Sequence, residues 1–284
     1  MNFKMIQICR ALVTGAFLVA MSGAVFADEQ TDLELVEELV LLEAELELER
    51  EVLADEKLME MANFLAGLES FSVHLRAGYD VMQENGQKIE FLENRRITLE
   101  RPDRLVVKEN SSSDRSHVLL FDGDTVTIAD NEAGVYAQAP QPGSIDDAIV
   151  YFLRDLQMRL PLAGMLTTRF PQELDNRLRL VEYVEESGAF SVPTHHIAAR
   201  TRDNDIQVWI SEGALPIPMR IVLTYIEYGE PQYWAEFSDW NLDPTIDKST
   251  FAYEPPEGAE QIVLAVQIAS AMDDVEIPGE GEQP

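Results

Sequence analysis

The feature that most constrains the fold is a series of short segments, spread between residues 71 and 240, in which apolar and polar residues alternate. Phe71–Arg76 is typical, because every second residue in it is apolar. A period of two places neighbouring side chains on opposite faces of a strand, so each segment has one apolar face. About eleven such segments follow one another, and Asn85-Gly86 between the first two is typical of a tight hairpin turn. The pattern therefore predicts an antiparallel meander.

Two helical segments interrupt the strand pattern. Ser144, with Asp147 three residues later, predicts a helix N-terminus, and apolar residues follow at helical spacing as far as Leu160. We expect a second short helix over Leu162–Phe170. Because the helices are inserted together, and not between successive strands, the sequence predicts an α+β architecture in which one sheet wraps around helices.

An acidic segment precedes the strands. Between Asp28 and Glu60 there are fourteen acidic residues and only two basic ones, Arg50 and Lys57, with leucines and valines at spacings of three and four. This pattern predicts one long acidic amphipathic helix. It is also typical of a coiled coil or a partner-binding helix. A solvated acidic extension is the alternative, and the sequence does not decide between the two.

The first residues have the layout of a secretory signal peptide. Lys4 and Arg10 precede the uncharged, mostly apolar run Ala11–Phe26, and small Ala27 follows it. We therefore expect cleavage after Ala27, export to the periplasm, and a mature chain with no transmembrane segment. Cys9 is the only cysteine, so the mature chain would have neither a disulfide nor a thiolate metal site.

The charge limits the partners. The formal net charge is −31, and it becomes −33 once the two bases of the signal peptide are removed. Such a chain repels phosphate backbones and anionic lipid surfaces, so we expect no nucleic-acid partner.

The sequence contains no catalytic motif that we recognise. The Gly-x-Ser-x-Gly, His-Glu-x-x-His, phosphate-loop and dinucleotide patterns are absent. His195 and His196 are adjacent in a predicted strand, so their rings would point to opposite faces and would not chelate one metal ion. For the same reason Trp209 is expected on the face opposite Val208 and Ile210. We predict no catalytic residue, no metal and no cofactor.

Seven short stretches, in this order, carry a resemblance to a known family. The chain resembles the DUF2092 family of predicted periplasmic proteins, and that family is similar to lipoprotein carriers of the LolA/LppX type. The resemblance extends over about residues 58–262 and does not include the acidic residues Asp28–Lys57. The stretches are Phe71–Val73, Arg101–Leu105, Phe121–Thr125, Val135–Tyr136, Pro193–His196, Val208–Ile210 and Leu215–Arg220.

The resemblance implies a fold and a cavity, but it supplies no catalytic residues. The predicted class is α+β: an antiparallel, unclosed half-β-barrel of about eleven strands, wrapped around inserted helices and preceded by a long acidic helix. An apolar cavity is expected between sheet and helices. We divide the chain into a signal peptide (1–27), the acidic helix (28–66), a half-barrel domain (67–262), and a C-terminal segment with a disordered acidic tail (263–284).

The favoured function is that of a non-enzymatic carrier or sensor for a lipid, an acyl chain or a lipoprotein. The alternative is an envelope protein–protein interaction module that acts through the sheet or the acidic helix, and an enzyme with scattered catalytic residues is a third class. Pro161–Gly164 is expected to let the second helix move, and Met158 would suit a variable guest. The sheet should contribute to the cavity Phe71, Val73, Phe91, Leu119, Phe121, Ile210, Leu223 and Phe237. The helices should contribute Phe152, Leu156, Leu160, Met165, Leu166 and Phe170.

Overall fold

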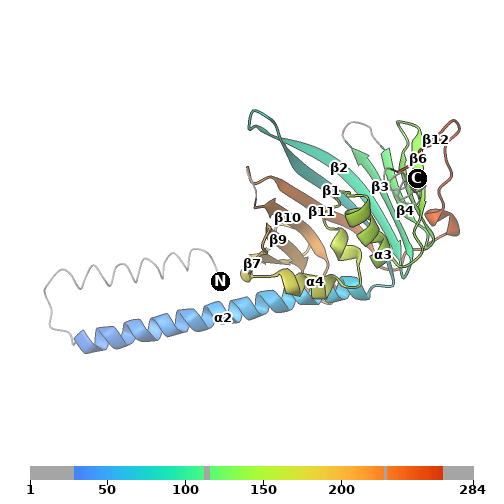
Figure 1. Cartoon of the computed structure of the whole chain (residues 1–284). Coiled ribbons are helices and arrows are strands. Elements are labelled where there is room, and N and C mark those ends of the chain that lie inside the picture. Colours follow the sequence, from blue (N-terminus) through green and yellow to red (C-terminus); the bar gives the residue numbers. More distant parts are fainter. Residues whose placement is uncertain (1–28, 112–115, 227–228, 265–284) are drawn as a thin grey trace, which may run out of the picture.

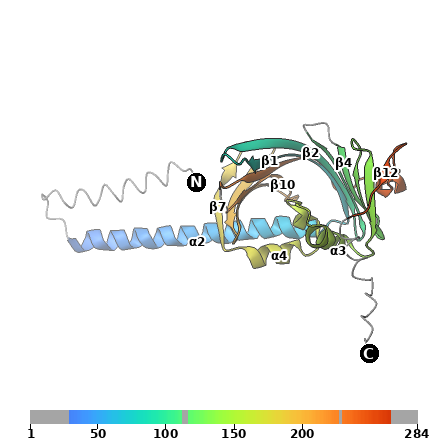
Figure 2. The same cartoon turned by 45° about the horizontal axis from the view of Figure 1, so that its top comes forward.

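The computed structural model describes residues 29–111, 116–226 and 229–264. Within them, a twelve-stranded sheet curves around a group of helices (Figures 1 and 2). The predicted signal peptide and the acidic tail lie outside the described residues and stay predictions. The strand order is β12-β6-β5-β4-β3-β2-β1-β11-β10-β9-β8-β7, so that β12 and β7 are the two edges. The predicted α+β class, an unclosed half-barrel, is confirmed.

Eleven of the strands correspond to the segments predicted from alternation. The first group is β1 (Ser70–Met82), β2 (Lys88–Glu100), β3 (Arg104–Ser111), β4 (Ser116–Phe121), β5 (Thr125–Asp130) and β6 (Val135–Pro140). The second group is β7 (Leu180–Ser187), β8 (Thr194–Arg200), β9 (Asn204–Ser211), β10 (Pro218–Tyr225) and β11 (Gln232–Asn241). The twelfth strand, β12 (Glu260–Gln261), was not predicted. It pairs parallel with β6, whereas the other pairs are antiparallel.

The long β1–β2 hairpin has the predicted turn. Gly86 has a φ of 83°, a conformation that glycine adopts without strain, and its N–H donates to the Gln83 carbonyl at 2.9 Å. Thirteen cross-strand pairs follow, from Met82↔Lys88 to Ser70↔Glu100. This hairpin forms the middle of the sheet, and β11 pairs with the other side of β1.

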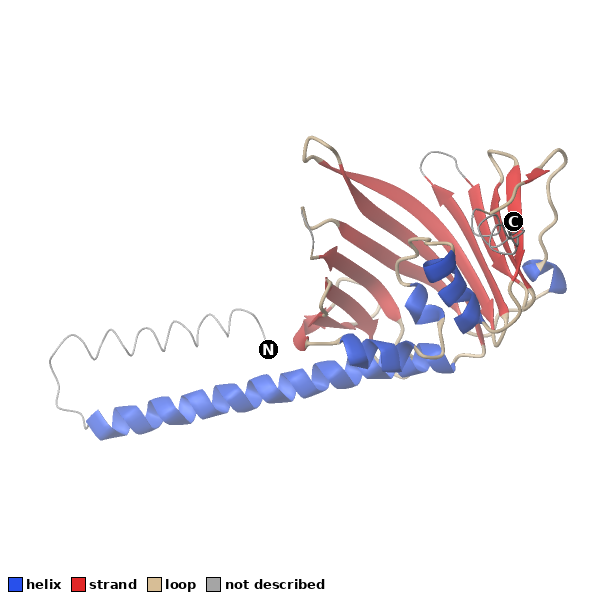
Figure 3. Cartoon of the chain, viewed as in Figure 1, coloured by secondary structure: helices blue, strands red, loops and turns tan. Residues whose placement is uncertain are grey.

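Short helices cover one face of the sheet (Figure 3). Of the predicted first helix, α3 (Ile145–Val150) begins at the expected capping box of Ser144 and Asp147. It continues as a π-helix, η1 (Tyr151–Asp155), and therefore ends before Leu160, the predicted end.

The predicted second helix is wrong in position. A single 3-10 turn, η2 (Ala163–Leu166), is followed by α4 (Phe170–Arg177), which begins where we expected the helix to end. Pro171 explains the error, because proline lacks an N–H and is favoured in the first turn of a helix, where that N–H has no partner. A proline directly after Leu162–Phe170 is equally consistent with a helix end, which is the position that the sequence predicts.

The acidic segment forms one helix, α2 (Glu29–Gly67). Its C-terminal turns lie under the arch of the sheet, where Ala54, Leu58, Met61 and Leu65 are buried in the main core. The rest projects away from the sheet (Figures 1 and 2). The helix ends at Gly67 and β1 begins at Ser70, while the core continues across this boundary, so the predicted division of the chain stays a prediction.

The sheet has two unlike faces. The covered face carries the apolar residues of each strand, in rows such as Leu105↔Phe121 and Val208↔Ile221. Trp209 lies on the opposite face from buried Val208 and Ile210, as predicted, and stacks on His196. On the outer face, Phe251 of η3 (Lys248–Phe251) packs on a small cluster of β3 and β4 residues.

Candidate ligand-binding cavity

A cavity of about 1110 Å³ lies between the sheet and its helical cover. The sheet contributes strands β1 to β5, β11 and β10, which are neighbours in the strand order. The cover consists of the segment from α3 to η2 and the C-terminal end of α2. The apolar residues of the sheet that line it are Phe71, Val73, Leu75, Val81, Met82, Ile97, Leu105, Val107, Val118, Leu119, Ile128, Phe237 and Trp240.

The cover contributes a second apolar wall. It comes from α2, α3, η1, η2 and the irregular segment between η1 and η2, through Leu65, Ile149, Leu153, Met158, Leu160, Pro161, Leu162, Ala163, Met165 and Leu166. Gln157 and Leu162 in that segment have φ values of 51° and 65°. Residues other than glycine rarely adopt this conformation, which costs about 1–2 kcal/mol each. The part of this wall between η1 and η2 is therefore built from strained, non-helical backbone.

Trp240 lines the cavity beside Phe71 and Phe237. Its ring centroid lies 5.5 Å from that of Phe71 and 5.8 Å from that of Phe237. Strict alternation from Phe237 would place Trp240 on the outer face. The register of β1 and β11 shifts between Ser72 and His74, however, and this irregularity turns the indole inward.

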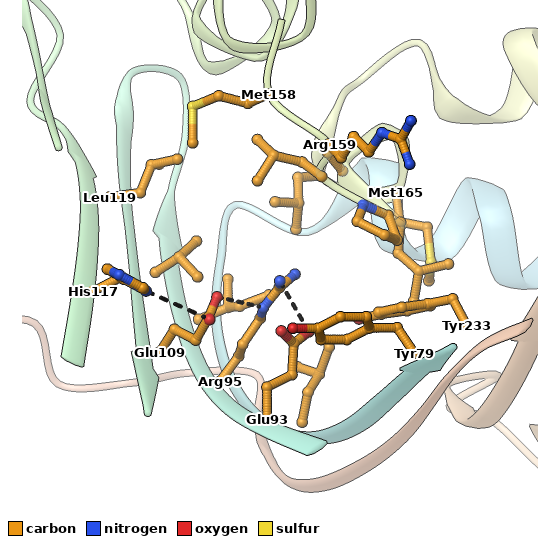
Figure 4. Close-up of a pocket in the computed structure, with 18 of the residues that line it drawn as sticks. Tyr79, Glu93, Arg95, Glu109, His117, Leu119, Met158, Arg159, Met165 and Tyr233 are labelled. Carbon is orange, nitrogen blue, oxygen red and sulfur yellow. Dashed lines mark hydrogen bonds and ion pairs between the residues drawn. The ribbon is translucent and has the colours of Figure 1, made fainter. Parts of the chain in front are cut away.

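Charged side chains lie in one row across neighbouring strands, and Figure 4 shows its members on β2, β3 and β4. Arg95 of β2 pairs in register with Glu109 of β3, which pairs with His117 of β4. The Arg95 Nε lies 3.2 Å from the Glu109 Oε2, and the His117 Nδ1 lies 3.6 Å from the Glu109 Oε1. The His117 Nε2 reaches Asp130 of β5 at 3.3 Å. A mostly apolar cavity thus has a row of charged side chains, its polar floor, on the sheet side.

Glu93 extends this row towards Tyr233. Its Oε1 lies 2.9 Å from the Arg95 guanidinium, as an ion pair whose geometry falls short of a hydrogen bond. Burial raises the pKa of Glu93, although the charge of Arg95 acts in the opposite direction. Burial also raises the pKa of Tyr233, which therefore keeps its phenolic proton at neutral pH. Burial disfavours the charged form of Arg95. The interactions of Arg95 with Tyr233, Glu93 and Glu109 favour that form more strongly, so the pKa of Arg95 is raised.

Half of the predicted cavity residues line this cavity, and they come from both the sheet and the cover. They are Phe71, Val73, Leu119, Leu160, Met165, Leu166 and Phe237.

The other predicted residues lie elsewhere, for two reasons. Phe121, Phe152 and Ile210 are buried in the packed core, and Leu156, Phe170 and Leu223 pack against that core. Phe91 faces the same side of the sheet but lies beyond the cover. It is 41% exposed and stacks on Tyr79 with ring centroids 5.8 Å apart.

Sequence reasoning missed the polar floor, although β2 carried a signal for it. Glu93 and Arg95 occupy positions that alternate in phase with apolar Phe91 and Ile97. Two charged residues on the apolar face of a central strand are unusual, because buried charges need partners. That phase relation would have identified both residues, but it does not identify Glu109, His117 or Tyr233.

The histidine pair behaves as its position in a strand requires. The His195 Nδ1 lies 2.9 Å from the Tyr183 hydroxyl on the covered side, and His196 stacks on Trp209 with ring centroids 4.1 Å apart on the other.

Among the described residues, no group of three or more histidines, cysteines and acids has a metal-binding arrangement. No helix in the described ranges combines the length and apolar character needed to cross a membrane.

One family of sequences matches most of the chain. It is DUF2092, described as a predicted periplasmic protein, and it matches residues 54–265. The match begins within α2, at the first of the helix residues that are buried in the core. No curated protein matches the chain.

Several solved structures are similar in fold at low sequence identity. The lipoprotein LppX of Mycobacterium tuberculosis is 12% identical, with a TM-score of 0.43 over 68% of this chain and 98% of LppX. A LolA-superfamily protein of Nitrosomonas europaea is 13% identical, with a TM-score of 0.36 over 70% of this chain and 97% of that one. MucB in the Pseudomonas aeruginosa MucA/MucB complex is 12% identical, with a TM-score of 0.40 over 71% and 61% of the two chains.

Proposed function

The chain belongs to the DUF2092 family of predicted periplasmic proteins, and from that premise we propose that it is a non-enzymatic carrier or sensor. The ligand would be apolar, such as a lipid or the acyl chain of a lipoprotein, and would bind in the cavity of the half-barrel. The alternative is a protein–protein interaction module.

The observation that carries this proposal is the cavity itself. Protein interiors are close-packed and contain few voids larger than a water molecule. A volume of about 1110 Å³ between a sheet and its cover is of the size of a ligand pocket, and the walls are mostly apolar, as such pockets are. An acyl chain gains about 0.8 kcal/mol for each buried methylene group, so this lining supports binding of a long chain.

Two features of the cavity wall and its rim support the binding of flexible apolar ligands. Met158 and Met165 line the cover, and methionine side chains adapt to guests of different shape. At the rim, Tyr79, Val81, Ile89 and Phe91 expose apolar surface on the face of the β1–β2 hairpin that continues from the cavity. We infer that a chain would reach the cavity along this hairpin and that the Pro161–Gly164 segment moves to admit it.

A titration with 1,6-diphenylhexatriene tests the proposal, because this hydrocarbon fluoresces in apolar surroundings and forms no hydrogen bonds. The delipidated protein should bind it saturably near one probe per chain. Met165→Trp fills part of the cavity and should weaken binding about tenfold or more. Leu215→Trp adds the same ring at an exposed loop position and should leave binding unchanged. Absence of saturable binding by the wild-type protein would falsify the carrier proposal.

One specific observation favours the second candidate, an interaction module. Leu39, Val40, Leu41 and Leu42 of α2 are all at least half exposed. Successive residues are 100° apart around a helix, so the apolar surface extends around the projecting part of α2 and is not confined to one side. Such surface is normally covered in soluble proteins. A stable protein complex that is lost on deletion of residues 29–46, with binding of the hydrocarbon probe retained, would support this function.

A further inference from the structure

The polar floor of the cavity contains two buried groups that have unused hydrogen-bonding capacity. Glu93 is 4% exposed and Tyr233 is 1% exposed, and both line the cavity. Within the described part of the chain, neither the Glu93 Oε1 nor the Tyr233 hydroxyl has a hydrogen-bond partner of acceptable geometry. A buried polar atom left in this state costs about 1–3 kcal/mol.

The neighbouring charges do not satisfy these two groups. The Arg95 Nε donates to Glu109. The Arg95 Nη2 lies near the Glu93 Oε1, but this contact is an ion pair without hydrogen-bond geometry. A side-chain hydrogen bond from Tyr233 favours the charged form of Glu93, so the two groups are neighbours, but the geometry of this contact is too poor to satisfy either the Glu93 Oε1 or the Tyr233 hydroxyl. The Glu93 oxygen can therefore still accept a hydrogen bond, and the phenol can still donate one.

The sign of the local charge restricts what could bind here. Glu93, Glu109 and Asp130 carry negative charge, while Arg95 is the only permanent cation of the row. A carboxylate or phosphate would add a further negative charge at a buried site whose single arginine already serves two glutamates, and such a charge is strongly disfavoured. A neutral hydroxyl instead donates to one oxygen and accepts from another.

We propose that Glu93 and Tyr233 form a recognition site for a hydroxyl group carried by an otherwise apolar ligand. This inference rests on the proposed function and adds the ligand class: a neutral, hydroxyl-bearing lipid, and not a fatty acid or an anionic phospholipid. The ligand hydroxyl donates to the Glu93 Oε1 and accepts from the Tyr233 hydroxyl, and the apolar remainder lies against the walls of the cavity.

Displacement of diphenylhexatriene by two matched ligands tests this site. 1-Dodecanol can donate and accept, whereas its methyl ether, 1-methoxydodecane, can only accept and is the more hydrophobic of the two. The wild-type protein should prefer the alcohol by about tenfold, which corresponds to about 1.4 kcal/mol, against the order of hydrophobicity. Affinities for the alcohol and the ether within twofold of each other would mean that the ligand hydroxyl does not hydrogen-bond to Glu93 and Tyr233, and would overturn the proposal.

Tyr233→Phe removes a single oxygen and keeps the ring in place. It should weaken binding of the alcohol and of the ether by about fivefold to tenfold, and binding of diphenylhexatriene should not change. Tyr253→Phe, outside the cavity, is the matched control and should change neither affinity. An unchanged affinity of the Tyr233→Phe protein for the alcohol would contradict the proposal.

Dodecanoate provides the remaining comparison. Arg159 is an exposed cation on the cover and lines the cavity, so it is the competing site for an anionic head group. Stronger displacement by dodecanoate than by dodecanol at pH 7.5, abolished in Arg159→Ala, would overturn the inference and leave the carrier function intact. Failure of diphenylhexatriene itself to bind would instead remove the carrier function.

Discussion

The guanidinium of Arg50 donates to the main-chain carbonyl of Tyr183, at 2.5 Å, and to that of the next residue at 3.0 Å. These carbonyls belong to β7, an edge strand, at the point where its register with β8 shifts. One of the two basic residues in the acidic segment thus ties the helix to the free edge of the sheet.

We predict that Arg50→Ala lowers the free energy of unfolding by about 1–3 kcal/mol, the usual range for hydrogen bonds from a charged group. Urea denaturation measures this change. Arg50→Lys keeps the charge but not the forked geometry, and should recover only part of the loss. Equal stability of the alanine variant and the wild type would show that the contact does not hold α2 in place.

The two ends of α2 should respond differently to change. Deletion of residues 29–46 removes exposed leucines, and we expect the free energy of unfolding to change by less than about 1 kcal/mol. Met61→Ala at the buried end should cost about 2–5 kcal/mol, because it leaves a cavity in the core. Loss of the cooperative transition on deletion, followed by circular dichroism, would show instead that the projecting part belongs to the folding unit.

His196 should make stability depend on pH. Burial lowers its pKa below the ordinary value of 6.5, although the hydrogen bond to Gln207 and the charge of Glu185 act in the opposite direction. The unfolded chain therefore binds the proton more readily, so the stabilisation is complete above the unfolded pKa and is lost as pH falls through the folded pKa.

The measurement is urea unfolding at about pH 7.5 and pH 5.5, which bracket the ordinary histidine pKa. His196→Phe keeps an aromatic ring against Trp209 but cannot titrate. The wild type should lose more stability over this interval than the variant does. An identical loss in the two proteins would mean that His196 does not contribute.

The strands could be predicted because their signal is local. Alternation and turn residues such as Asn85-Gly86 act over a few positions, and one face of each strand must be buried. All the predicted sheet residues, Phe91 and Ile210 included, accordingly lie on the covered face. Trp240 is a case where the periodicity failed, because an irregularity in the pairing of β1 with β11 changed the phase.

The limits of the cavity could not be predicted, because they depend on where the helices seat. Phe121 and Phe71 both lie on the covered face and belong to the same buried core, yet only Phe71 lines the cavity. The position of the cover was itself mispredicted, since Pro171 is equally consistent with a helix stop and a helix start. The partnership of Glu93 with Tyr233 joins β2 to β11 across β1, a long-range relation for which one sequence has no local pattern.

The most direct test of the central claim, that the cavity binds an apolar chain, is a native mass spectrum of the protein purified from the periplasm without detergent. The account predicts a chain carrying one additional mass of lipid size, which solvent extraction removes and which is reduced in Met165→Trp but not in Leu215→Trp. A spectrum that contains only the bare chain, from a preparation in which diphenylhexatriene also fails to bind, would contradict it.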